Sequence, residues 1–356
     1  MTNPVTQGLT TLAPAAVDET AESIVSAQEP DGQIAWFPGG HTDPWDHVEA
    51  AMGLDVAGRH ANARAAYEWL RRTQNPDGSW YRAYQGTEVT DPIRESNFTA
   101  YLCVGLRHHL LSTADDGFLD LMWPTVCRAL DFVLGLRSRD GEIYWARDSA
   151  GVVAQEALLT GCSSVYHALR SAVVLAESRG EQQPGWELAA ARLGHVIEAH
   201  PERFAPRTRY SMDWYYPILG GALRSPAARE RIDADWDRFV VPGLGLRCVS
   251  DRPWVTGAET CELVLALCAI GERDRAAELF ADVQHLRHVD GSYWTGYVYP
   301  DDAMWPQERP TWTAGAVLLA GAALAGEPAT LAVFGMPALD VELVGAAPGG
   351  CPAQHP

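Results

Sequence analysis

An Asp-Gly turn occurs four times in this chain, each time after an apolar, helix-like stretch and before a tryptophan. The copies are Gln28-Glu29-Pro30-Asp31-Gly32 with Trp36, Gln74-Asn75-Pro76-Asp77-Gly78-Ser79-Trp80, Arg139-Asp140-Gly141 with Trp145, and His288-Val289-Asp290-Gly291-Ser292-Tyr293-Trp294. The four aspartates lie 46, 63 and 150 residues apart, so the last gap has room for three units of similar length. Repeats of this length are typical of stacked supersecondary units, none of which can bury its apolar face alone.

Apolar residues recur at spacings of three and four along nearly the whole chain, and strand-like alternation is rare. This pattern predicts twelve helices, near residues 15–28, 44–58, 60–74, 96–112, 117–137, 161–179, 185–199, 213–224, 226–240, 257–271, 273–287 and 309–326. The fold class is therefore all-α, and the helix count is typical of an (α/α)6 barrel, a toroid of six helical hairpins. The even-numbered helices are richer in small and apolar residues, so we expect them to form the inner ring.

The predicted toroid is a single catalytic domain over residues 1–326, followed by a Pro/Gly/Ala-rich, loosely ordered tail over 327–356. A net charge of −19, with arginine as the only basic residue besides histidine, argues against nucleic acid and anionic membranes as partners. The N-terminus lacks the pattern of a signal peptide, and the longest apolar run, 314–325, is too short to span a bilayer. We therefore expect a cytoplasmic protein. The sequence does not indicate its oligomeric state.

The first turns of the six predicted inner helices carry carboxylates, hydroxyls and aromatic rings, unlike the apolar segments that follow them. Inner helices of a toroid run parallel, so these turns are expected to meet at one end of the barrel. Aromatic rings can stack on the apolar faces of sugars, while carboxylates and amides bind sugar hydroxyls. This mixture favours a sugar chain as the bound partner, and it requires no cofactor.

Cleavage of a glycosidic bond needs two carboxyl groups, one to protonate the leaving oxygen and one to act on water or on the anomeric carbon. Asp46 follows Trp45 in the first inner turn, and Glu259 and Glu262 are three residues apart at the start of the fifth inner helix. Residues at this spacing share a helical face. The predicted catalytic pair is therefore Asp46 with Glu262, and Glu259 is the substitute.

The remaining candidates are predicted to bind substrate. Aromatic subsites are expected from Trp45, Tyr215, Tyr216, Trp254, Trp294 and Trp312, and hydroxyl binding from Asn97, Asp213 and Glu308. The first turns of the inner helices add His41, Asp43, His47, Glu49, Tyr166 and His167, and the last Asp-Gly turn adds Tyr293. Acidic residues also favour first helical turns because of the helix dipole, so the sixfold coincidence, not any single residue, supports a site. The histidines lack the spacing of a metal site, and none is predicted.

The Gln-x-Pro-Asp-Gly-Ser-Trp repeat resembles that of squalene-hopene cyclases and prenyltransferase-type toroids. The resemblance implies the fold but not the chemistry, because the nearest match to the cyclase Asp-x-Asp-Asp motif is Asp233-Ala234-Asp235-Trp236, in an outer, surface-like helix. A terpene cyclase or prenyltransferase-like enzyme therefore stays as one alternative. A catalytically inactive carbohydrate-binding toroid is the other.

The segment from Phe37 to Tyr84 resembles glucoamylase-like (α/α)6 glycosidases. The chain to about residue 325 also resembles actinobacterial proteins often labelled prenyltransferase-like, a family that includes mycobacterial methylmannose polysaccharide hydrolases. The matching stretches are 39–49, 210–217 and 252–262. This resemblance implies an endo-acting α-mannosidase that cleaves internal α-1,4 bonds of a partly O-methylated mannan. By analogy with (α/α)6 hydrolases an inverting course is expected, with carboxyl groups about 6.5–9.5 Å apart, against about 5–5.5 Å for retention.

Overall fold

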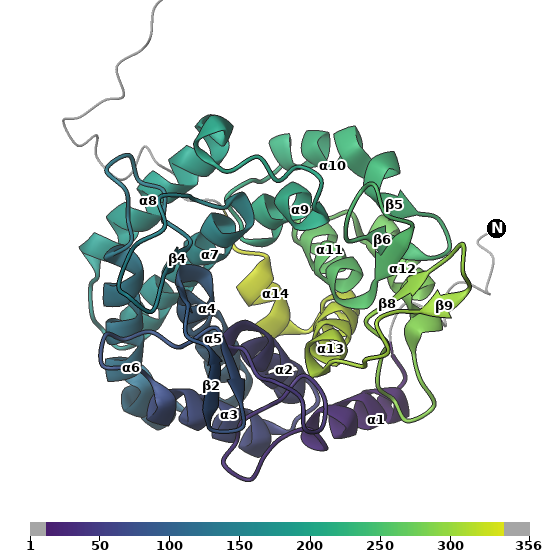
Figure 1. Ribbon diagram of the computed structural model, residues 1–356, viewed down its shortest axis with the longest axis horizontal. Helices are drawn as coiled ribbons and strands as arrows, with labels where there is room; N and C mark the ends of the chain where they lie inside the picture. The colour runs from purple at the N-terminus through teal and green to yellow at the C-terminus, as the bar shows by residue number, and fades with distance from the viewer. Residues whose placement is uncertain (1–11, 338–356) are drawn as a thin grey trace, which may run out of the picture.

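Two concentric rings of helices build the protein, whose computed structural model describes residues 12–337 (Figure 1). The inner ring consists of α2 (Pro44–Val56), α4 (Ser96–Ala100) continued by α5 (Leu102–Thr113), α7 (Leu159–Ser178), α9 (Ser211–Leu219), α11 (Gly257–Ala269) and α13 (Thr311–Ala325). Each inner helix contacts the next, and α13 returns to α2, so the ring is closed. The outer ring consists of α1 (Pro14–Val25), α3 (His60–Thr73), α6 (Asp116–Leu134), α8 (Pro184–Ala199), α10 (Ala227–Phe239) and α12 (Arg273–Asp282). The predicted (α/α)6 toroid is confirmed.

The inner helices are apolar around most of their circumference because they are covered on most sides. Helix α13 shows this best, since its alanines, leucines and glycines are buried along nearly its whole length. Close packing against α2 depends on facing glycines: a Cβ at Gly53 would lie 2.7 Å from the Cα of Gly315. Among residues 12–337, no single helix combines the length and hydropathy that a membrane crossing requires. Helix α13 and the following helix α14 (Pro328–Phe334) reach that length and hydropathy only when taken together, and they are bent by 103° relative to each other.

The Asp-Gly turns join neighbouring hairpins. Gly78 has a positive φ of 90°, and a Cβ there would overlap the carbonyl of Arg128 on the next outer helix. Gln74 Nε2 donates to the carbonyl of Thr125 on the same helix at 2.9 Å. The turn at Gly291 packs in the same way on Glu19 of α1, so the last repeat meets the first helix. The glycine is therefore required both by its conformation and by the approach of the neighbouring backbone.

The tryptophans that follow the four turns are not structurally equivalent. The residue two places after each glycine is buried, and in three of the turns it forms a bridge back across the turn; these residues are Ile34, Trp80, Ile143 and Tyr293. Only Trp80 is a tryptophan among them. Trp36, Trp145 and Trp294 come later in the connections and are only half-buried.

Short strands, which the periodicity did not predict, lie in the connections that lead from outer to inner helices. They are β1 (Ala83–Gln85), β2 (Glu88–Asp91), β3 (Arg94–Glu95), β4 (Ala146–Arg147), β5 (Val240–Val241), β6 (Gly245–Arg247), β7 (Trp254–Thr256), β8 (Gly296–Val298) and β9 (Ala303–Met304). All pairs are antiparallel: β1 with β2, β3 with β4, and β5 to β9 in one five-stranded sheet. The strands therefore form part of the end at which the inner helices begin.

Helix α14 (Pro328–Phe334) corrects the prediction of a loosely ordered tail from residue 327. Glu327 caps it by accepting hydrogen bonds from the backbone amides of Ala329 and Thr330. Side chains on the inner-ring side hold its far end: Arg107 donates to the carbonyl of Ala332 at 2.9 Å, and Arg224 donates to that of Met336 at 2.8 Å. The helix contacts α5, α11 and α13 and lies within the inner ring in Figure 1. Residues 338–356 of the predicted tail lie outside the described residues.

Candidate active site

Three carboxyl groups lie along the first two turns of α2. Asp43 is the N-cap and accepts a hydrogen bond from the backbone amide of Asp46 at 3.0 Å, with Pro44 at the first helical position. Glu49, three residues after Asp46, is 1% exposed and accepts from Trp45 Nε1 at 3.3 Å and from the Tyr101 hydroxyl at 3.4 Å. Asp46 keeps part of its surface exposed. The start of this helix thus carries two buried carboxyl groups, Asp43 and Glu49, and one that solvent can reach, Asp46.

Two further carboxyl groups come from the start of α11. The side chain of Glu262 is almost fully buried, and its two carboxylate oxygens accept hydrogen bonds from the hydroxyls of Tyr215 and Tyr216 on α9. Glu259, one turn earlier, is 7% exposed and is hydrogen-bonded to the thiol of Cys248. Because α9, α11 and α2 begin at the same end of the ring, their first turns meet there.

The electrostatics show that these carboxyl groups are close enough to affect one another. Burial, and then the negative charges of Asp43, Glu49 and Glu262, raise the pKa of Asp46. Burial, followed by the charge of Glu49, likewise raises the pKa of Glu262 well above its ordinary value. The structure therefore brings together the two residues predicted as a catalytic pair. Burial and mutual repulsion therefore favour the protonated forms of Asp46 and Glu262.

Glu49 offers a test of this cluster that needs no substrate. Burial raises its pKa from 4.5 to about 7, so folding disfavours its ionised form. Below pH 4.5, the ordinary pKa of the group, Glu49 is protonated in both the folded and the unfolded protein, and its burial costs no stability. As the pH rises through about 7, the unfolded state is favoured because only there is the carboxylate solvated, so the free energy of unfolding falls. Glu49→Gln is therefore expected to stabilise the protein by roughly 2 kcal/mol at pH 8, and by much less at pH 4.5.

Urea unfolding of wild type and Glu49→Gln at both pH values measures this difference. The exposed Glu29→Gln is the matched control, expected to change stability little at either pH. An equal effect of Glu49→Gln at both pH values would contradict the proposed burial of an ionisable group.

Three of the aromatic residues predicted as sugar platforms are buried instead. Trp45 is 6% exposed and packs against Tyr101, with ring centroids 5.2 Å apart, and against Tyr216 at 5.5 Å. Tyr215 and Tyr216 are also buried, and their hydroxyls are directed to Glu262. These rings support the carboxyl groups and supply hydrogen-bond donors, but they present little open surface for stacking.

Half-buried aromatic rings near Asp43 are better placed to meet a ligand. Trp36 donates through Nε1 to Asp43 Oδ2 at 2.7 Å, and its ring lies 4.4 Å from His41 and 6.5 Å from Trp312 between centroids. His41 and Trp312 were predicted, whereas Trp36 was identified only as part of a repeat. Its position seven residues before Asp43, in the same connection, was the available signal.

Four predicted binding residues have other roles. Both ring nitrogens of His47 are hydrogen-bonded to backbone groups of Ile34 and Ala66. His167 bonds the carbonyl of Val333 in the segment of α14, and Tyr166 receives a hydrogen bond from Arg170 at 3.0 Å. The Tyr293 hydroxyl donates to Gln284 within the last Asp-Gly turn. The structure does not bring these side chains to the carboxyl cluster. His47, Tyr166 and His167 lie in the predicted helices, but their side chains are directed away from the cluster.

The other predicted residues lie at the same end of the ring but in different surroundings. Asn97 is buried beside Gly161, and Asp213 Oδ1 accepts from the Thr160 hydroxyl at 2.7 Å. Trp294 lies under the guanidinium of Arg309, 5.3 Å from its ring centroid.

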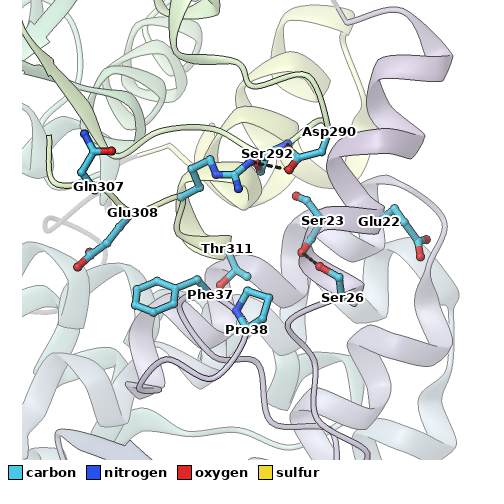
Figure 2. Close-up of a pocket in the computed structure, with 11 residues that line it drawn as sticks. Glu22, Ser23, Ser26, Phe37, Pro38, Asp290, Ser292, Gln307, Glu308 and Thr311 are labelled. Carbon is cyan, nitrogen blue, oxygen red and sulfur yellow. Dashed lines mark hydrogen bonds and ion pairs between the residues drawn. The ribbon is translucent and has the colours of Figure 1, made fainter. Parts of the chain in front are cut away.

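Glu308 lines a separate pocket of about 470 Å³ beside α1, together with Phe37, Asp290 and Arg309 (Figure 2). In that view the Glu308 carboxylate points away from Asp290, which forms an ion pair with Arg309.

Sequence reasoning missed three further groups around the cluster. Tyr101 follows Phe98 by three residues in the second inner helix, a spacing that could have identified it. Burial raises the pKa of Glu95 to about 7, with Arg82 opposing the shift, and the negative charge of Asp43 adds to it. Cys248 lies after a short strand, and no motif in the sequence marks it as a partner of Glu259.

A closed (α/α)6 ring with two interacting carboxyl groups at the start of its inner helices has the architecture and the groups of a glycoside hydrolase. Solved structures share this fold. A glycosidase solved with glucose covers 88% of this chain and 96% of its own at a TM-score of 0.72 and 14% identity. The GH63 mannosylglycerate hydrolase from Thermus thermophilus covers 85% and 99% at a TM-score of 0.65 and 13% identity.

No model of a known protein family matches the chain. One curated relative, the MMP endo-(1,4)-3-O-methyl-alpha-D-mannosidase of Mycolicibacterium hassiacum, is 58% identical over 313 residues, or 88% of this chain and 87% of the relative. The chain belongs to the family of this mannosidase and is a glycoside hydrolase, as the sequence predicted.

Proposed function

We propose that this protein is an endo-acting α-1,4-mannosidase that hydrolyses a 3-O-methylated mannan by an inverting mechanism. The relative's activity supports the substrate class. The pairing of Asp46 with Glu262 is supported by the position of both at the start of inner helices and by the charge of Glu262, which contributes to the raised pKa of Asp46, whereas the inverting course is proposed by analogy with other (α/α)6 hydrolases. Methyl ethers on the sugar would replace hydroxyl donors with apolar surface, which suits the half-buried rings of Trp36 and Trp312.

Asp46 is the better candidate for the general acid. A general acid must be protonated when substrate binds and must reach the leaving oxygen. Asp46 retains exposed surface, and the charges of Asp43 and Glu49 favour its protonated form. In the proposed step its proton passes to the glycosidic oxygen as the bond from that oxygen to the anomeric carbon breaks.

Glu262 is then the general base. Burial raises the pKa of Glu262, and the hydroxyls of Tyr215 and Tyr216 oppose that rise by stabilising the ionised form, which must accept a proton from the attacking water. The water oxygen forms the new bond to the anomeric carbon from the face opposite the leaving group, so the product at first carries a β-hydroxyl. Glu259, one turn away, is the alternative base.

Hydrolysis of defined substrates tests this function. We expect methylated α-1,4-manno-oligosaccharides to yield shorter oligosaccharides from internal cleavage, with unmethylated chains cut more slowly. Proton NMR during the first minutes should show β-anomeric reducing ends before mutarotation. First-formed α-anomers would overturn the inverting course. Release of monosaccharide alone would overturn endo action.

The same experiment separates the two alternatives. A non-catalytic carbohydrate-binding toroid would bind these oligosaccharides without cleaving them. A cyclase would leave them untouched, and its candidate acids are poorly placed here. Asp233 and Asp235 lie on the outer helix α10, in ion pairs with Arg275 and Arg238.

A further inference from the structure

The side chain of Trp305, directly after β9, is 54% exposed. It lines a groove of about 450 Å³ on the five-stranded sheet, whose apolar wall includes Val249, Pro253 and Val298. A single exposed apolar side chain is ordinary on a protein surface, but an indole in the wall of a groove with further apolar residues offers a binding surface. The groove is distinct from the carboxyl cluster, whose residues do not line it.

The Trp305 residue is held in a fixed position by Trp254 and by the backbone of β8. Trp254 Nε1 donates to the backbone carbonyl of Trp305 at 2.8 Å, and the two rings meet edge to face with centroids 5.1 Å apart. The Trp305 amide donates to the carbonyl of Gly296 at 2.9 Å. A Cβ at Gly296 would lie 2.6 Å from Trp254 Nε1, so glycine makes room for the supporting indole. A ring held in this way loses little conformational freedom when a ligand stacks on it.

Two short chain segments link the walls of the groove to the residues of the carboxyl cluster. Val249 in its wall directly follows Cys248, whose thiol is hydrogen-bonded to Glu259. On the other side, β7 begins at Trp254 and leads directly into α11, which carries Glu259. Two short segments therefore connect the groove to the same carboxyl group. The groove therefore lies at the same end of the ring as the carboxyl cluster.

The charged residues of the groove indicate which kind of ligand can bind there. Arg252 and Asp301 are its ionisable residues, one of each sign. A balanced pair beside indole rings suits a neutral ligand that has both apolar faces and hydroxyls, and it gives no preference for an anion. We propose that this groove is a remote subsite for the same methylated mannan, which binds sugars beyond the cleavage point with their methyl ethers against Trp305.

The proposal rests on the proposed function, because it assigns the groove to that enzyme's own substrate. Trp305→Ala is expected to raise KM for long methylated oligosaccharides about ten-fold while leaving kcat unchanged. Short oligosaccharides that fill only the cluster should be cleaved as by wild type. Trp305→Phe should recover part of the loss. The matched control is Val152→Ala, which changes another exposed apolar side chain, in the connection between α6 and α7.

Binding separates failure of this subsite from failure of the proposed function. Calorimetric titration of Glu262→Gln with long methylated chains should show tight binding that Trp305→Ala weakens about ten-fold, even if no cleavage is detected. Equal KM and equal affinity with and without the Trp305 side chain, at every chain length, would overturn the subsite. A change of molar mass in light scattering on Trp305→Ala would also overturn it, since the groove would then be an interface between copies.

Discussion

Glu262→Gln is expected to lower kcat on methylated manno-oligosaccharides by at least about a thousand-fold, with little change in KM. Glutamine keeps the shape of the side chain and can still bond Tyr215 and Tyr216, but it cannot accept a proton from water. The matched control is Glu259→Gln, which removes a carboxylate one turn earlier on the same helix and should cost far less. If the two variants show the reverse order, Glu259 is the base.

The same variants distinguish acid from base. Asp46→Asn should retain much of its rate on an aryl oligosaccharide whose phenol leaves without protonation, because the acid is then not needed. Glu262→Ala should instead be rescued by azide, which replaces the activated water, and should yield a β-mannosyl azide. If azide instead rescued Asp46→Ala, Asp46 would be the general base and Glu262 the general acid. Tryptophan fluorescence and thermal unfolding check that each variant is folded.

The ring of helices could be predicted from the sequence because the physics that fixes it is local and repeated. Three- and four-residue periodicity marks each helix, and Gly78 is required by both its positive φ and the neighbouring carbonyl of Arg128. The apolar composition of α13 indicates an inner helix regardless of its neighbours. The short strands escaped detection because pairs such as β3 and β4 contain only two residues each.

The site could be predicted only at the level of helical turns. Asp46 and Glu262 were identified because a first-turn acid and an i, i+3 pair are visible in the sequence. Which face a side chain takes depends on partners distant in the chain. His47 turns to Ile34 and Ala66, and the ring of Trp45 packs inward on Tyr216. Neither contact has a sequence signal, so both residues were expected in the binding surface.

The C-terminal segment was misjudged for a related reason. Pro, Gly and Ala predominate from residue 327 onward, and this composition is typical of irregular chain. The seven residues of α14 are too few to show periodicity, and their helix is stabilised by tertiary contacts, among them the bond of His108 to Thr330. Composition could not reveal that Arg107 and Arg224, both distant in the sequence, have hydrogen-bond acceptors in this segment.

A chain that ends at Gly326 is therefore expected to lose roughly 5 kcal/mol or more of its free energy of unfolding, whereas one that ends at Pro337 should retain it. The shorter chain lacks the buried side chains of Val333 and Phe334 and leaves Arg107 and Arg224 without their carbonyl acceptors. Burial lowers the pKa of both guanidinium groups to about 10, which shows that the charged groups are poorly solvated in the fold. Loss of their carbonyl acceptors would leave these buried charges without hydrogen-bond partners, which is destabilising.

Should the shorter chain fail to fold, a point variant of the full chain tests the same contact. Phe334 is 3% exposed and packs on His167 with ring centroids 5.4 Å apart, so Phe334→Ala should cost about 3–5 kcal/mol in urea unfolding. Ala332→Ser, at an exposed position of the same helix, should cost less than about 1 kcal/mol. Equal, small losses for both variants would mean that α14 contributes little to the barrel. A large loss for Phe334→Ala alone would make this helix part of the catalytic domain, because the carboxyl cluster depends on inner helices that α14 holds together.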